Sequence, residues 1–210
     1  MNKVIYLIRH SETEKNIKGI DKNNPNENKK IKLTHKGLLD AKKYFKNEIF
    51  KNIEKVYCSD YVRSYETGKL LKDEIIIDSR FCERISGKPD FLYTPNYYFY
   101  KQIMDENYKF ENGESRKEIT NRMYEGLMDI LNDTQTKEVA IISHGVAMTF
   151  LIMKFCELEI VDTENKIRRI KFNDKVIFND KFNYLETFKL VFNKKNEIVE
   201  IKNERIDYNV

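Results

Sequence analysis

The stretch VIYLIRHSETEKN, residues 4–16, decides how the rest of the chain is interpreted. Its first five residues are apolar and rich in β-branched types, which is typical of a buried strand. This strand ends at Arg9-His10. Because ligands of open α/β sheets bind outside the carboxyl ends of the strands, an arginine and a histidine at this point indicate a site for an anion.

A second stretch repeats the pattern. The apolar run 139–143 ends in His144-Gly145, and His144 is one of only three histidines in the chain, with His10 and His35. Two apolar strands that each end in a histidine predict a fold that brings His10 and His144 together at one edge of a sheet.

The segments between these strands alternate between strand and helix patterns. Thr34 is placed to cap a helix that would bury Leu38, Ala41, Phe45 and Ile49. Asp60 would cap a helix that follows a strand at 56–59 and runs to about residue 71. A third strand is expected at 75–77, and the helix after 143 is almost wholly apolar. Such alternation favours a parallel sheet covered on both faces.

The capping box formed by Ser115 and Glu118 predicts one more helix, which would bury Ile119, Met123, Leu127, Ile130 and Leu131. The segments 186–192 and 198–203 alternate as a hairpin that turns at 194–196. We therefore expect an α/β fold, a three-layer α/β/α sandwich with a mostly parallel sheet and an antiparallel hairpin at its C-terminal edge. No linker divides residues 1–210, so a single domain is predicted.

Two segments are less regular. Residues 87–112 contain prolines and an aromatic cluster, which suggests a short, variable helical insertion on the substrate side, its aromatic side chains packing its underside. Residues 157–183 give mixed signals, and only short strands around 170–172 and 176–178 are predicted. Arg168 and Arg169 in this segment could reach a substrate, but a solvated or edge-strand position is expected for them.

Composition narrows the function classes. A net charge of +4 and a sequence pI of about 8.7 come from lysines interleaved with acidic residues, whereas a nucleic-acid binder would cluster them, so no nucleic-acid partner is expected. No apolar run is long enough to cross a bilayer, so no membrane partner is expected either. An odd set of three cysteines favours free thiols in the cytoplasm. The oligomeric state is not predicted.

Arg9, His10, Arg63 and His144 define the expected chemistry if they converge. Two guanidiniums match phosphate oxygens, and their charge keeps an enclosed imidazole neutral and nucleophilic. A carboxylic acid at the rim would protonate a leaving alcohol, and no metal would be needed. A metal site from His10, Glu12 and His144 is the disfavoured alternative, because adjacent arginines repel a cation.

These residues lie in motifs that resemble those of the histidine phosphatase superfamily, which includes cofactor-dependent phosphoglycerate mutases. Arg9-His10-Ser11-Glu12-Thr13 with Asn16 is similar to the signature RHG-E-T-x-x-N. Four further motifs agree in order: Leu33-Thr34-x-x-Gly37-x-x-x-Ala41, Ser59-x-x-x-Arg63-x-x-x-Thr67, Gly113-Glu114-Ser115 and Ser143-His144-Gly145. One such motif is weak, whereas five in order across residues 4–150 are specific.

The resemblance implies a role for each matching residue. His10 would accept the phosphoryl group, and Arg9, Arg63 and His144 would form the phosphate pocket. Asn16 and the Gly145 backbone would be lesser phosphate ligands, and Glu83 would match the acid/base glutamate that follows the third strand. The resemblance also implies a three-layer fold and no metal.

The chain departs from the family pattern at two places. Ser11 stands where glycine is usual, so its Cβ could narrow the pocket or require a backbone angle that serine adopts less readily. Residues 86–90 lack the usual sequence after the acid, which leaves Asp78, Glu111 and Glu114 as alternative acids.

Three functions follow. The first is a metal-independent phosphomonoester phosphatase that acts on a small molecule through a phosphohistidine at His10. The second is a phosphoglycerate mutase, for which 2,3-bisphosphoglycerate would be needed as a primer; its known members carry a longer insertion between Arg63 and His144. The third is a non-catalytic module that binds a phosphorylated ligand.

Overall fold

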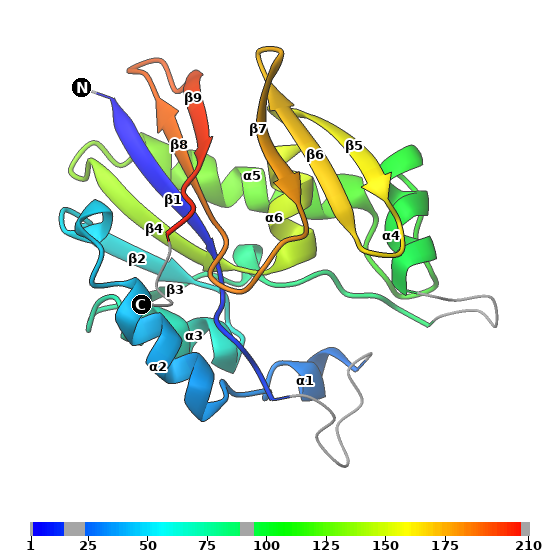
Figure 1. Cartoon of the computed structure of the whole chain (residues 1–210), viewed down its shortest axis with the longest axis horizontal. Coiled ribbons are helices and arrows are strands. Elements are labelled where there is room, and N and C mark those ends of the chain that lie inside the picture. The colour runs from blue at the N-terminus through cyan, green and yellow to red at the C-terminus, as the bar shows by residue number, and fades with distance from the viewer. Residues whose placement is uncertain (1, 15–23, 89–94, 207–210) are drawn as a thin grey trace.

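The computed structural model describes residues 2–14, 24–88 and 95–206. Figure 1 shows a central sheet between helices and a smaller second sheet beside it. The strands are β1 (Lys3–Arg9), β2 (Lys55–Cys58), β3 (Ile76–Ile77), β4 (Glu138–Ser143), β5 (Glu157–Asp162), β6 (Ile167–Phe172), β7 (Lys175–Asp180), β8 (Thr187–Phe192) and β9 (Ile198–Asn203). The α-helices are α1 (Pro25–Asn28), α2 (His35–Tyr44), α3 (Val62–Lys69), α4 (Pro95–Met104), α5 (Arg116–Asn132) and α6 (Gly145–Ile152), with 3-10 turns η1 (Glu48–Phe50) and η2 (Ser79–Phe81).

The central sheet has the order β3-β2-β4-β1-β8-β9. Strands β1 to β4 are parallel, and β8 and β9 form the predicted antiparallel hairpin at the edge. The register pairs Arg9 with Ser143, so β1 and β4 end at the same level. His10 and His144 therefore leave the sheet side by side, as the two apolar stretches predict.

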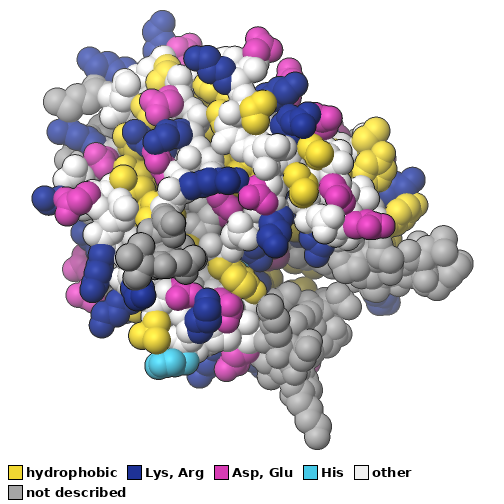
Figure 2. Space-filling model, viewed as in Figure 1, with side chains coloured by type: hydrophobic (Ala, Val, Ile, Leu, Met, Phe, Trp, Pro, Cys, Tyr) yellow, Lys and Arg dark blue, Asp and Glu magenta, His cyan; other side chains and the backbone are white. Residues whose placement is uncertain are grey.

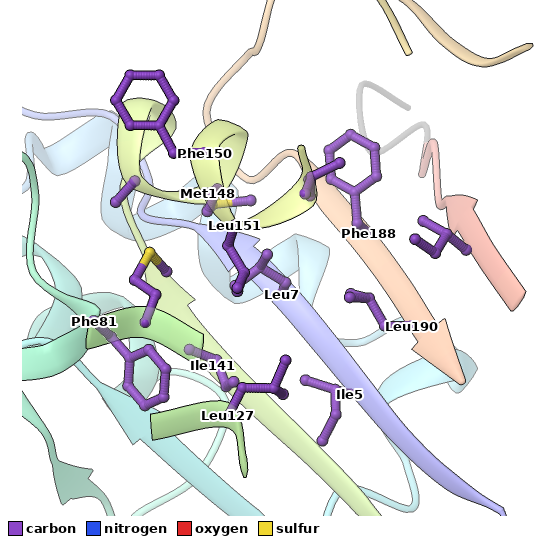
Figure 3. Packing of buried hydrophobic residues seen from close by; sticks show 14 of the residues in the cluster. Ile5, Leu7, Phe81, Leu127, Ile141, Met148, Phe150, Leu151, Phe188 and Leu190 are labelled. Atoms are coloured by element: carbon purple, nitrogen blue, oxygen red, sulfur yellow. The ribbon is translucent and has the colours of Figure 1, made fainter. Parts of the chain in front are cut away.

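Alternation along β1 distributes its side chains between two cores. Ile5 and Leu7 pack among the residues of α5 and α6 (Figure 3), whereas Tyr6 and Ile8 pack with α2 on the opposite face. All four are buried, and each contributes about 1.5–3 kcal/mol of hydrophobic free energy. A strand buried on both faces explains the continuous apolar run at residues 4–8 and confirms the three-layer sandwich.

The capping box predicted at Ser115 is present, and every residue predicted for the buried face of α5 is buried. Thr34 caps α2 through a hydrogen bond from Gly37 N, but Leu38 is 37% exposed and Tyr44 is buried instead. The prediction for Leu38 was wrong because α2 turns the side of Gly37, Ala41 and Tyr44 toward the sheet.

Two further expectations need correction. Asp60 does not cap α3: the N-cap is Tyr61, whose side chain makes no capping bond, while the Asp60 carboxylate accepts from Lys29 at 2.6 Å. The irregular segment 157–183 holds three strands, not two, and they form a separate antiparallel sheet in the order β5-β6-β7. The sequence concealed β5 because its residues alternate only between exposed and half-buried positions.

The insertion at 87–112 contains α4 in its described part. Tyr98 is fully buried and stacks on Phe110 at 4.1 Å, and Phe99 stacks on Phe150 of α6 at 5.7 Å. Tyr98 and Phe99 therefore pack as expected, whereas Tyr97 and Tyr100 of the same cluster are exposed. Phe91 and Tyr93 lie outside the described residues.

The surface mixes the two signs of charge. Figure 2 shows basic and acidic side chains interspersed on the visible face, without a basic stripe. Within the described residues, no helix is both long and apolar enough to cross a membrane.

Candidate active site

His10 lies directly after β1 and is 6% exposed. Its Nδ1 is 2.8 Å from the carbonyl oxygen of Ser11. A carbonyl only accepts, so Nδ1 carries the proton and the lone pair of the neutral ring lies on Nε2. Burial and the positive charges of Arg63 and Arg9 hold the pKa of His10 well below 6.5. The ring is therefore neutral at neutral pH, with a nucleophilic Nε2.

Arg63, in the first turn of α3, reaches this nitrogen. Its Nε donates to His10 Nε2 at 3.2 Å, while its Nη1 donates to the carbonyl of Asn28 at 2.8 Å. The guanidinium also lies 4.4 Å from the centre of the Tyr61 ring. These contacts fix a positive charge beside the nucleophile, at the position where an anion would meet it.

Arg9 supplies the second positive charge. Its Nη1 donates to the Phe182 carbonyl at 2.7 Å, and its guanidinium lies 4.7 Å from the centre of the Tyr184 ring. Its Nε is buried and has no hydrogen-bond partner among the described residues. A buried donor without a partner is costly, so this N–H is suited to an incoming oxygen.

His144 lies 5.1 Å from His10, measured between ring centres, and is fully buried. Its Nε2 is 2.7 Å from Ser59 Oγ, which also accepts from Tyr61 N at 3.3 Å. The hydroxyl of Ser59 can donate to Nε2, and in that tautomer Nδ1 carries the single ring proton of the neutral imidazole. Burial and the Arg63 charge hold the pKa of His144 well below 6.5. Its Nδ1 has no partner among the described residues and is thus a donor for a ligand.

Glu83 lies at the N-terminus of α6. Its Oε1 accepts from Arg84 N at 2.9 Å and from Ala147 N at 3.2 Å. Burial lowers the pKa of Arg9 and of Arg63, whereas the negative charge of Glu83 raises both pKa values. The carboxylate is therefore electrostatically coupled to both arginines.

The alternative acids are placed differently. Asp78 caps η2 and pairs with Arg80 at 2.7 Å, Glu114 pairs with Arg122 at 2.7 Å, and Glu111 is exposed. Among these carboxylates, Glu83 is the one held at α6 beside Gly145, and it bonds only to backbone N–H groups in the described part of the chain.

Ser11 causes no backbone strain. It is not among the described residues with positive φ, and its Oγ donates to the Gly37 carbonyl at 2.7 Å. Its backbone N–H donates to Thr67 Oγ1 at 3.1 Å. The serine therefore ties β1 to α2 and α3, and its side chain is directed at Gly37. At Gly37 itself, a Cβ would lie 2.3 Å from the Glu12 carbonyl, so glycine allows this close approach.

The remaining expected residues are placed as follows. Gly145 is the first residue of α6, next to Arg9, and Asn16 lies outside the described residues. Glu12 bonds to Thr34 Oγ1 at 3.0 Å, and no metal-binding group of histidine, cysteine or acidic side chains occurs in the described segments. The structure thus brings His10, Arg9, Arg63, His144 and Glu83 to one edge of the sheet.

Sequence reasoning missed Tyr184 and undervalued Arg168. Tyr184 lies between β7 and β8, with its ring centre 5.9 Å from that of His10. Arg168 on β6 was expected to be solvated or at an edge, but its guanidinium packs over Phe182. Arg168 comes from the segment 157–183, whose pattern was unclear, and Tyr184 directly follows that segment. Only the β-alternation around Ile170 hinted at a buried neighbour.

Comparison with protein families decides the relationship: residues 5–173 match the histidine phosphatase superfamily (branch 1). The chain belongs to this superfamily. Curated relatives of this histidine phosphatase include the probable phosphoglycerate mutase GpmB of Enterobacter sp. (strain 638), 26% identical over 163 residues, which are 70% of this chain and 72% of the relative. A probable phosphatase of Schizosaccharomyces pombe is 26% identical over 160 residues, 73% of each chain.

Solved structures share the fold. A phosphoserine phosphatase variant from Entamoeba histolytica, in complex with phosphoserine, superposes with a TM-score of 0.67 at 18% identity, covering 95% of this histidine phosphatase and 96% of that chain. A mycobacterial glucosyl-3-phosphoglycerate phosphatase has a TM-score of 0.66 at 15% identity, covering 97% and 98%. The fold assigned from the sequence is therefore confirmed.

Proposed function

We propose that this protein is a phosphomonoester phosphatase that transfers the phosphoryl group first to Nε2 of His10 and then to water. One observation carries the proposal: the hydrogen bond from His10 Nδ1 to the Ser11 carbonyl leaves the lone pair on Nε2, within 3.2 Å of an arginine that attracts phosphate.

In the first step, the Nε2 lone pair of His10 attacks phosphorus and the bond from phosphorus to the ester oxygen breaks. Arg63 Nε, which donates to this lone pair in the free protein, turns to a phosphate oxygen. The N–H groups of Arg9 and His144 that lack a partner in the free protein bind the other phosphate oxygens. They stabilise the negative charge on these oxygens while the ester bond breaks. Glu83 gives its proton to the leaving oxygen.

In the second step, the carboxylate of Glu83 takes a proton from water. The resulting oxygen attacks phosphorus, the bond from phosphorus to nitrogen breaks, and the electron pair returns to His10 Nε2. Inorganic phosphate then leaves, and Glu83 is protonated again for the next cycle.

The charge that a metal ion supplies in other phosphoryl transfer sites would come here from two guanidiniums. We therefore propose a reaction that needs neither metal nor cofactor, on a small phosphomonoester. Cys58, Cys82 and Cys156 are unpaired, which supports a cytoplasmic enzyme.

The test is the phosphoenzyme. With a ³²P-labelled phosphomonoester and EDTA present, the wild-type protein should acquire an acid-labile, base-stable label and release phosphate, whereas His10→Ala should do neither. The matched control is His35→Ala, which replaces an exposed histidine at the start of α2 and should retain the label and the turnover. A labelled His10→Ala protein would contradict the nucleophile assignment.

The names of curated relatives favour one second candidate, a phosphoglycerate mutase. Such an enzyme would return the phosphoryl group from His10 to a second hydroxyl instead of water. Dependence on 2,3-bisphosphoglycerate and interconversion of 2- and 3-phosphoglycerate with little free phosphate would favour the mutase. Vanadate binding without turnover of any phosphomonoester would favour a non-catalytic module.

A further inference from the structure

A pocket of about 140 Å³ lies beside the phosphate-binding groups, between α4, the β5–β6 hairpin and the first turn of α6. Apolar and aromatic side chains dominate its lining, among them Phe99, Tyr100, Val146 and Ile160. Three cationic side chains, Arg84, Lys166 and Arg168, also line it. Mostly apolar walls with a few charged groups are typical of a site that orients a small molecule.

The pocket adjoins the candidate catalytic groups along the chain. Val146 follows Gly145 at the start of α6, and Arg84, another lining residue, follows Glu83. Phe182 connects the two sites: its carbonyl accepts from Arg9, and its ring lies 4.9 Å from the Arg168 guanidinium. A molecule whose phosphate lies at His10 can therefore extend past Glu83 into this pocket.

Arg168 forms no ion pair with an acidic side chain in the described part of the chain, although the charge of Glu83 acts on it from a distance. Its Nη1 donates to the neutral hydroxyl of Thr149 at 2.9 Å, its Nε is buried without a partner, and Phe99 and Phe182 pack against its guanidinium. Burial and the nearby charge of Arg9 lower the pKa of Arg168 to about 10, so it is still charged at neutral pH.

The neighbouring arginine on β6 differs from Arg168 because it has an acidic partner. Arg169 is half-buried on the other side of the strand and pairs with Glu159 at 3.0 Å. The one carboxylate of the pocket, Asp162, accepts from Glu164 N and from the backbone and side chain of Asn165 within its own turn. Because the buried Nε of Arg168 has no hydrogen-bond partner among the described residues, its guanidinium is suited to bind an anion.

We infer that this pocket is a second oxyanion subsite, in which Arg168 binds a carboxylate or a second phosphate at the far end of the substrate. The inference rests on the proposed phosphatase function and adds the substrate class: small phosphomonoesters with a second anionic group and a short apolar body. A planar guanidinium binds either oxyanion with two parallel hydrogen bonds.

The test compares three substrates with the same three-carbon chain on the whole protein: propyl phosphate, O-phospho-3-hydroxypropanoate and 1,3-propanediol bisphosphate. We expect kcat/KM for one or both of the doubly anionic esters to exceed that of propyl phosphate by roughly 10- to 100-fold, the range for a charge-assisted hydrogen-bonded pair. The ester that is preferred distinguishes a carboxylate from a phosphate subsite.

The Arg168→Met variant keeps an unbranched apolar side chain and removes the charge. We expect it to lose most of the preference for the anionic esters, mainly through KM, whereas the matched control Arg169→Met should keep that preference. Equal kcat/KM for all three esters in the wild-type protein would overturn the subsite while leaving the phosphatase proposal intact. A wild-type preference that persists in Arg168→Met would overturn the assignment to Arg168. No turnover of any ester would overturn both proposals.

Discussion

The two buried histidines make stability depend on pH in a direction that can be measured. The folded protein holds His10 and His144 neutral, because burial and the arginines lower both pKa values well below 6.5. In the unfolded chain each histidine has an ordinary pKa of about 6.5 and gains a proton in mild acid. The unfolded state then binds more protons than the folded state, so stability falls as the pH decreases below about 6.5.

The size of the effect follows from proton linkage. Between about pH 7 and about pH 5.5, a histidine that stays neutral in the fold and titrates normally in the unfolded chain removes about 1.3 kcal/mol of unfolding free energy. His10 and His144 together remove about 2.5 kcal/mol of unfolding free energy, a large fraction of the 5–15 kcal/mol typical of a domain.

The assay is urea unfolding followed by circular dichroism in phosphate-free buffers across this pH range. The His10→Asn variant should lose about 1.3 kcal/mol less than the wild-type protein between the two ends of the range. The control His35→Asn replaces a histidine that is exposed at the surface. Equal losses in the wild-type and His10→Asn proteins would refute the view that the fold holds His10 neutral.

Three other predictions concern single side chains. Glu83→Gln should slow hydrolysis of alkyl phosphates about 100-fold more than that of p-nitrophenyl phosphate, whose leaving group needs no proton; equal slowing in steady-state assays would exclude Glu83 as the acid. Ser11→Ala should lower the unfolding free energy in urea by about 1 kcal/mol through loss of the bond to Gly37, with kcat unchanged because the Ser11 carbonyl still orients His10. Glu114→Gln should cost about 2 kcal/mol in the same unfolding assay, since Arg122 would keep its charge without its carboxylate partner, and an unchanged midpoint would contradict this.

The sequence was sufficient for the middle of the central sheet because β1 and β4 are buried on both faces. A run such as residues 4–8, apolar at every position, occurs where helices cover both sides, and the strand ends then locate His10 and His144 without any coordinates. The capping box of Ser115 and Glu118 predicted the start of α5 just as directly, because its two reciprocal hydrogen bonds require these two side chains.

The second sheet was harder to predict from the sequence than the central sheet. In β5 no residue is fully buried, and in β6 only Ile170 is, so neither strand has the continuous apolar pattern of the core. The position of the Arg168 guanidinium depends on two aromatic rings distant in sequence, Phe99 and Phe182, and no local pattern encodes such a contact. Tyr184 reaches His10 for the same reason, through the path of the chain between β7 and β8.

The residues proposed for phosphoryl transfer and those proposed for the second subsite lie on different sheets. His10 and His144 follow strands of the central sheet. Arg168 and Lys166 belong to the β5–β6 hairpin, whose strands pair within the separate three-stranded sheet β5-β6-β7. If Arg168 binds the far end of the substrate as we propose, exchange of the β5–β6 turn would change which esters are preferred without replacing any residue that surrounds His10. Substrate preference and phosphoryl transfer could then be altered independently.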